Sequence, residues 1–378
     1  MPVTINGSTG ITTPTSNIGT ATVSNTITTS ALSVTGNIIG DVSTTGTIAM
    51  ASSFKRNRII NGNMLIDQRY AGSANTPSDG AYVVDRWQYS LSASGKFTTQ
   101  QNAGSLTPPA GFTKYLGLTS NGSYSVGSTD GFGVKQRVEG YNVADLAWGT
   151  ANAKTVTLSF WVYSSSTGTF GGTLFNASAN RFYIYSYTIN STATWEYKTV
   201  TIPGDTTGTW NATNDVGIEV YFSIGAGSGR ATTPGSWGST LYVAPTGQTS
   251  IVGAGTGAYW YITGVQLEVG TKATPYEMQI YSDQLAQCQR YYYKQDTIIT
   301  WFFPINNINV YKACNYIFPV TMRAAPTCVI SGAATDGSFQ SSFPAVGSTT
   351  KNQAQLRGDT TSSSNYSSFT DFTASAEL

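Results

Sequence analysis

Few of the residue types that carry catalysis occur in this sequence of 378 residues. It contains no histidine, which excludes Ser-His-Asp and Cys-His catalytic groups, histidine general bases and most zinc or iron sites. No glycine-rich phosphate-binding loop of the Walker A type is present either. Among the common catalytic arrangements a pair of carboxylates remains, which is the minimal requirement of a glycosidase.

The acidic residues could supply such a pair. A glycosidase needs two carboxyl groups roughly 5 to 9 Å apart, and the 19 acidic residues of the chain will form some close pairs by chance. We expect turn formers, surface acids and ion-pair partners instead, and we predict no enzymatic activity, no catalytic residue and no cofactor. The acids concerned are Asp130, Glu139, Asp205, Asp215 and Glu219.

Tryptophans in loops are the candidate ligand-binding residues, because sugar rings stack their C–H faces on aromatic rings. Trp148, Trp210 and Trp237 lie in segments rich in Gly, Asn or Thr, whereas Trp161 and Trp260 lie within predicted strands. The first three are therefore predicted to contact a glycan. The alternative is that they cap the predicted sandwich or fill an interface between subunits.

A structural calcium ion is a weaker hypothesis. Asn61, Asn63, Asp67 and Glu268 would lie near one another if the first and last strands of the central domain pair. Oxygen ligands of this kind suit calcium. Hydrogen-bonded turn residues are the favoured interpretation, so no metal is predicted.

The composition is typical of extended β structure and excludes several partners. Charged residues make up 10% of the chain, with 23 Tyr and 8 Trp. A net charge of +1 without a basic run argues against nucleic acid, and the lack of a long apolar stretch argues against membrane insertion. The first ten residues lack the pattern of a signal peptide, and the three cysteines fit buried thiols, so we expect synthesis in the cytoplasm.

Residues 1–54 differ from the rest of the chain. They contain a single charged residue, Asp41, and much Thr, Ser and Gly, while Ile and Val recur at strand-like spacing. One copy of such a ribbon cannot bury its apolar side, but three copies wrapped around an axis can. We predict an extended, trimerising β stalk that attaches the protein to a larger particle; a flexible tether is the alternative.

From residue 55 the pattern is that of a β-sandwich with jelly-roll character. In 155–164, Val156, Leu158, Phe160 and Val162 alternate with polar or aromatic residues and define a core face. Similar alternation and frequent turns predict an all-β fold in which 55–274 form the sandwich. Further strands are expected at 182–189, 195–202, 217–224 and 259–267, with long loops at 225–257.

A helix and a smaller β domain are predicted to follow. Apolar residues three or four apart indicate a connecting helix at 275–294. The C-terminal β domain is placed at 295–378, with strands at 298–303, 310–318 and 327–330.

Six motifs follow one another along roughly residues 55 to 330. They are KRNRIINGNMLIDQR at 55–69, VDRW at 84–87, YITGVQLEVG at 261–270, ATPYE at 273–277, QLAQCQRYYY at 284–293 and FPVTMRAAP at 318–326. In this order they resemble a module of bacteriophage tail fibres and related tail proteins, whose jelly roll is similar to carbohydrate-binding modules, and their length makes the resemblance specific. Without the resemblance, the arginines and aspartates of 55–86 fit an ion-paired lock on the start of the sandwich, with Trp87 in the core.

The resemblance implies a structural protein of the virion tail that contacts polysaccharide on the host surface during attachment. It implies a homotrimer joined to other virion tail proteins through residues 1–54. Two alternatives share the scaffold: a tailspike glycan depolymerase that uses a carboxylate pair, and a head fibre or capsid decoration protein.

The cell-facing surface is predicted to lie away from the N-terminal segment. The region 204–257, together with the C-terminal domain around 301–316, is the expected location, because it contains the longest irregular stretch of the sandwich. Trp210 and Trp237 are the expected contacts. Removal of either ring should weaken glycan binding by roughly 1 to 3 kcal/mol and leave the fold intact.

Overall fold

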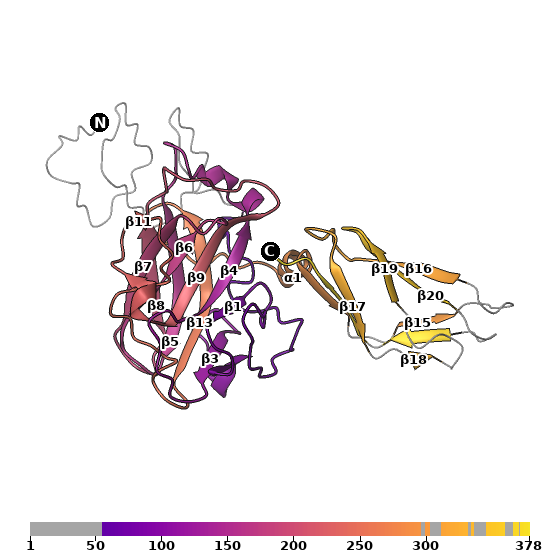
Figure 1. Ribbon diagram of the computed structural model, residues 1–378, viewed down its shortest axis with the longest axis horizontal. Helices are drawn as coiled ribbons and strands as arrows, with labels where there is room; N and C mark the ends of the chain where they lie inside the picture. The colour runs from indigo at the N-terminus through magenta and orange to yellow at the C-terminus, as the bar shows by residue number, and fades with distance from the viewer. Residues whose placement is uncertain are drawn as a thin grey trace, which may run out of the picture. The chain divides into compact units, whose positions relative to one another are not determined.

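The computed structural model describes residues 55–295, 299–302, 311–331, 334–335, 345–359, 366–369 and 371–378. The stalk, virion attachment and trimerisation predicted for residues 1–54 lie outside these residues. Within them the chain is mostly β, with one short α-helix (Figure 1). No helix in these ranges is long and apolar enough to cross a bilayer.

Two antiparallel sheets form a β-sandwich (Figure 1). The six-stranded sheet has the order β1 (Gln88–Leu91), β4 (Gly131–Glu139), β9 (Val216–Ala226), β6 (Gly168–Phe175), β7 (Phe182–Ile189) and β11 (Trp237–Gly238). The five-stranded sheet has the order β2 (Phe97–Gln101), β3 (Leu116–Ser120), β13 (Tyr259–Val269), β5 (Val156–Ser164) and β8 (Glu196–Ile202). The prediction of a sandwich in this part of the chain is confirmed.

The core lies between the two sheets and follows the predicted alternation. Val156, Leu158, Phe160 and Val162 of β5 are fully buried. Phe160 meets Phe222 of the opposite sheet, with ring centroids 5.1 Å apart. Because the strand pleat directs every second side chain inward, these positions can only face the other sheet.

Trp87 is buried in this core, as predicted. Its ring contacts Phe222, and its indole N–H donates to the carbonyl of Asn61 at 3.0 Å.

The region 225–257, predicted as long loops, contains less irregular structure than expected. Strand β9 continues to Ala226, and three short strands follow: β10 (Ala231–Thr232), β11 and β12 (Ala244–Pro245), of which β10 and β12 pair in parallel. Short 3-10 turns lie at η1 (Ala103–Ser105), η2 (Gly140–Asn142), η3 (Ala144–Leu146) and η4 (Ser228–Arg230).

The helix α1 (Tyr281–Gln289) is shorter than the predicted 275–294. Before it, Glu277 bonds to the sandwich: its carboxylate accepts from the Asn57 N–H at 2.8 Å, and its own N–H donates to Gln266 at 2.8 Å. After it, the residues predicted as the last helical turn form β14 (Tyr292–Gln295). The extended ends are thus fixed by tertiary hydrogen bonds, which override the helical spacing.

The C-terminal part forms three small antiparallel sheets of three strands each. Their main apolar cluster includes Phe318, Met322, Leu356 and Phe372. The first sheet contains β14, β22 (Asp371–Ser375) and β17 (Thr327–Ser331). The second contains β15 (Ile299–Phe302), β21 (Tyr366–Phe369) and β18 (Ala334–Thr335), and the third contains β16 (Tyr311–Ile317), β20 (Gln353–Asp359) and β19 (Ala345–Thr349).

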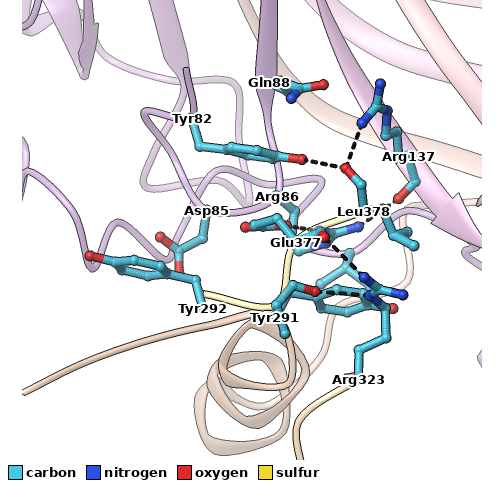
Figure 2. Close-up of polar contacts among 12 residues, drawn as sticks. Tyr82, Asp85, Arg86, Gln88, Arg137, Tyr291, Tyr292, Arg323, Glu377 and Leu378 are labelled. Atoms are coloured by element: carbon cyan, nitrogen blue, oxygen red, sulfur yellow. Dashed lines mark hydrogen bonds and ion pairs between the residues drawn. The ribbon is translucent and has the colours of Figure 1, made fainter. Parts of the chain in front are cut away.

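Residues 376–378 connect the sandwich with these sheets (Figure 2). The Glu377 carboxylate forms ion pairs with Arg69 at 3.0 Å and with the buried Arg86. Arg323, from the C-terminal part, donates to the backbone carbonyls of Ala376 and Glu377 at 2.9 and 3.0 Å. Charge-assisted hydrogen bonds of this kind fix both partners, because a buried charge without a partner would be strongly unfavourable.

The predicted ion-paired lock is present in part. Arg69 pairs with Asp85 at 3.3 Å, whereas Asp67 accepts hydrogen bonds within its own turn and Arg58 pairs with Asp145 instead. Asp85 is almost fully buried. Burial raises the pKa of this carboxyl from 3.8 to about 7, and the opposing effects of Arg69 and of hydrogen bonds from Gln68 do not cancel it.

The free energy of unfolding should therefore fall as the pH rises towards neutrality. Between pH 3.8 and 7 the folded chain holds the Asp85 proton more tightly than the unfolded chain, so stability decreases across this window and levels off above it. We expect a loss of roughly 2 kcal/mol between pH 5.5 and 8, measured by urea unfolding. No histidine titrates in this pH window, because the sequence contains none. In Asp85→Asn the loss should disappear, and an unchanged pH slope would contradict the assignment.

Candidate functional site

The three predicted glycan-binding tryptophans come together at one place, but they face one another. The ring centroids of Trp148 and Trp210 lie 4.8 Å apart, and those of Trp148 and Trp237 lie 5.3 Å apart. The interplanar angles are 80° and 77°, an edge-to-face arrangement that stabilises aromatic clusters. We call these three residues the tryptophan cluster.

Each indole N–H of the tryptophan cluster has a hydrogen-bond acceptor within the protein. Trp148 donates to the carbonyl of Lys154, and the other two indoles donate to backbone carbonyls of the segment 203–207. Trp148 is buried, and Trp210 and Trp237 pack against the core. The cavity beside Trp148 and Trp210 holds about 30 Å³, well below the roughly 300 Å³ of a ligand pocket. Trp148 is thus part of the core, whereas Trp210 and Trp237 are half-buried against it, an arrangement that fits the alternative in which these rings cap the sandwich.

The four candidate calcium ligands are used in hydrogen bonds. Asn61 donates to two backbone carbonyls at 2.8 and 3.0 Å, and Asn63 accepts from a glutamine side chain. Asp67 accepts from two N–H groups of its own turn, and Glu268 accepts from the N–H and hydroxyl of Thr274. In the part of the chain that the structure describes, no group of three or more acidic or cysteine side chains could hold a metal ion.

Two of the buried candidate acids, Asp205 and Glu219, form ion pairs. Asp205 accepts a two-pronged contact from Arg181 at 2.6 and 2.8 Å, and Glu219 pairs with Lys135 at 2.6 Å. Burial raises the pKa of Asp205, but the hydrogen bonds from Arg181 outweigh it and hold the pKa below its ordinary value. A general acid needs the opposite shift.

The other three acids also have local partners. Glu139 accepts from Arg290 and from the Tyr291 hydroxyl, and these hydrogen bonds outweigh burial and lower its pKa. Asp130 accepts from the Tyr124 hydroxyl and a turn N–H, while Asp215 accepts from the next backbone N–H. These contacts are those of ion pairs and turns.

A second aromatic surface covers the outer face of the five-stranded sheet. On β5 the residues between the core positions include Trp161 and Tyr163, which point outward. Trp161 pairs across the sheet with Tyr197 of β8, and Tyr163 with Tyr261 of β13. Ring centroids are 5.3 Å apart in the first pair and 5.9 Å in the second. Tyr259 stacks on both Tyr163 and Tyr261.

Trp161 and Tyr197 form part of an open depression of about 580 Å³, which we call the aromatic depression. Phe112, Tyr276 and Met278 also line it. The backbone beneath it carries a bulge between Thr263 and Gln266. Gly264 in this bulge has φ +63°, and a Cβ there would lie 2.7 Å from the Phe112 ring. Glycine is therefore required for the close approach of ring and backbone.

Trp161 differs from the other described tryptophans in its hydrogen bonding. The indole N–H groups of residues 87, 148, 195, 210, 237 and 260 each donate to a protein oxygen. No described residue accepts from Trp161, whose ring is half-buried beside Tyr197, which is 42% exposed. The depression thus combines exposed ring surface with an indole donor that has no described acceptor, whereas every indole donor of the tryptophan cluster has an acceptor.

The signal for this surface was present in the sequence. Once alternation along 155–164 assigns Phe160 and Val162 to the core, Trp161 and Tyr163 must face outward. Large aromatic residues at outward positions are candidates for contacts. A location within a strand does not exclude Trp161 from ligand contact, because a strand has two faces.

Comparisons with known proteins gave structural matches only, since no protein-family model and no curated protein matched the chain. One match is the enzymatically active domain of a tailspike protein of bacteriophage CBA120, with 12% identity and a TM-score of 0.31, covering 57% of this chain and 22% of that chain. Another is a Bacteroides thetaiotaomicron protein described as sugar-binding, with 12% identity and a TM-score of 0.32, covering 57% and 100%.

A third match is the family 11 carbohydrate-binding module of a Clostridium thermocellum cellulosomal cellulase, with 11% identity and a TM-score of 0.27. It covers 54% of this chain and 98% of that chain. Similarities at this level carry no argument about what the protein binds. The candidate site therefore depends on the geometry of the aromatic depression.

The tryptophan cluster should behave as core in unfolding experiments. Trp148→Ala should lower the free energy of unfolding by roughly 3 to 5 kcal/mol, because it removes a buried ring and leaves a cavity between Trp210 and Trp237. Trp161→Ala is the matched control, and we expect a smaller loss because its ring is half-exposed. Urea unfolding followed by circular dichroism would measure both. An unfolding midpoint of Trp148→Ala equal to that of the parent would contradict this role.

Proposed function

We propose that the protein binds a neutral glycan chain on the aromatic depression. The observation that carries this proposal is the indole N–H of Trp161, for which no described residue serves as acceptor, beside the exposed ring of Tyr197. A buried or half-buried tryptophan usually finds a hydrogen-bond partner. A sugar hydroxyl would supply the missing acceptor, while the C–H face of the ring would stack on the indole.

The shape of the site favours a chain over a small ligand. The aromatic depression is wide and open, with apolar surface from Phe112, Tyr276 and Met278 around the central pair. Small ligands are commonly held in enclosed pockets that cover most of their surface. An open aromatic surface suits several linked sugar units in weak contact, because each unit needs only one exposed face.

We further propose that the protein is a non-enzymatic tail fibre protein of a bacteriophage virion, in which residues 1–54 attach to other tail proteins. Support comes from the six motifs between residues 55 and 326 that resemble tail fibre modules. The hydrogen bonds and ion pairs of all five candidate acids support the absence of catalysis. A homotrimer would present three aromatic depressions at once, and multivalency would turn weak single contacts into firm attachment to host polysaccharide.

Substitution of Trp161 tests the glycan site. We expect Trp161→Ala to weaken binding by roughly 5- to 150-fold, which corresponds to the 1 to 3 kcal/mol of a stacking contact on a flat ring. Affinity electrophoresis of the full chain in gels with xylan, mannan, dextran or β-glucan would measure the change. Tyr281→Ala is the control, because this ring is 59% exposed outside the depression. Equal retardation of parent and Trp161→Ala by a polysaccharide that retards the parent would contradict the site.

The assembly has its own test. Light scattering of the full chain should give three times the mass of one chain, and deletion of residues 1–54 should lower this value if the stalk holds the trimer. A monomer with residues 1–54 present would contradict the trimer.

Release of reducing ends from a bound polysaccharide would contradict the non-enzymatic assignment.

A further inference from the structure

A second cavity, unrelated to the aromatic depression, lies between the first residues of the sandwich and helix α1. Its volume is about 310 Å³, within the range of sites for small ligands. Three basic residues line it, Lys55, Arg58 and Arg290, and no acidic residue does. We call it the basic pocket. In a chain whose charged residues amount to 10%, three cations around one cavity are an unusual concentration.

Two of the three cations are held in place by other residues of the protein. Arg290 uses Nε and Nη2 to bind Glu139, at 3.2 and 2.7 Å. Arg58 uses Nη2 to bind Asp145 at 2.8 Å and Nη1 to bind a backbone carbonyl at 3.1 Å. These contacts orient the guanidinium groups before a ligand arrives, so the entropic cost of ordering these side chains on binding is lower.

Donors remain after these contacts are counted. Arg58 Nε is buried and has no acceptor among the described residues. No described residue accepts from Arg290 Nη1, and Lys55 forms no ion pair within the described part of the chain. Glu139 and Asp145 offset two of the three positive charges, so the pocket retains about one positive charge and several directed N–H groups.

The rest of the lining is suited to a sugar ring. Gln279, Gln287 and Asn142 provide amide groups, and Tyr141 provides a ring that is 62% exposed. Amides can bond to hydroxyl groups, and the tyrosine ring offers a face for stacking. The lining therefore combines recognition of one negative charge with recognition of a polyhydroxylated ring.

We propose that the basic pocket binds an acidic sugar, a pyranose that carries a carboxylate or a phosphate. The acidic group would accept from Arg290 Nη1 and Lys55, beside the positive charge of Arg58, and the ring would lie against Tyr141. The site is separate from the aromatic depression and does not depend on the proposal made for it. It would let one chain distinguish acidic from neutral polysaccharides.

Titration calorimetry of the full chain with glucuronate, glucose 6-phosphate and glucose tests the proposal. At low ionic strength we expect at least one acidic sugar to bind 10-fold or more tightly than glucose, and added salt should reduce this difference because the attraction is electrostatic. Glucuronate binding indicates a carboxylate ligand and glucose 6-phosphate binding a phosphate ligand, and either supports the proposal. Binding of neither more tightly than glucose overturns it.

The substitution Arg58→Gln locates the site. Its partner Asp145 has a side chain that is 46% exposed, so the carboxylate left behind stays solvated and the fold should survive. We expect the preference for the acidic sugar to be lost in Arg58→Gln and to persist in Lys272→Gln, which removes the same charge outside the pocket. A far-ultraviolet circular dichroism spectrum and a urea unfolding midpoint of Arg58→Gln close to those of the parent would verify folding independently. An acidic-sugar affinity in Arg58→Gln equal to that of the parent would overturn the assignment.

Discussion

The pleat of β5 and β13 is the constraint on which the rest of the structure depends. Each strand must bury one row of side chains between the sheets, and that requirement fixes the direction of the other row. Phe160 and Trp260 complete the core, so Trp161 and Tyr261 are directed to the outer face, where their rings contact Tyr197 and Tyr163. A shift of register by one residue would exchange the two rows, expose the core and bury the aromatic surface. Fold and candidate site are therefore specified together.

Several charged residues in the described part of the chain form pairs that join distant segments. Glu377 meets Arg69 and Arg86 from the start of the sandwich, and Arg290 meets Glu139 across 151 positions of sequence. Such buried pairs contribute little net stability, but the loss of one partner is costly. Hydrogen bonds from basic residues lower the pKa of Glu139 and Asp205, which is the opposite of the shift that a general acid needs. At the basic pocket the cations exceed the acids that hold them.

The two aromatic groups of the sandwich show how similar residues serve different purposes. In the tryptophan cluster each indole N–H already has a protein acceptor, and the rings cover one another. At the aromatic depression the rings are neighbours across strands, and one donor has no described acceptor. Hydrogen-bond satisfaction separates the two cases more clearly than exposure, since Trp161, Trp210 and Trp237 are all half-buried.

The sequence by itself determined several strands and their core face, because alternation is local: 182–189 coincides with β7, and residue order alone assigns the core face of 155–164. The end of the helix was not determined locally, since Tyr292 and its neighbours pair with β22, more than 70 positions away. The same holds for the tryptophan cluster and for the basic pocket. Whether Trp148 packs edge-to-face against Trp210, or whether Arg58 and Arg290 line one cavity, depends on segments brought together only by tertiary packing, and spacing along the chain carries no information about such contacts.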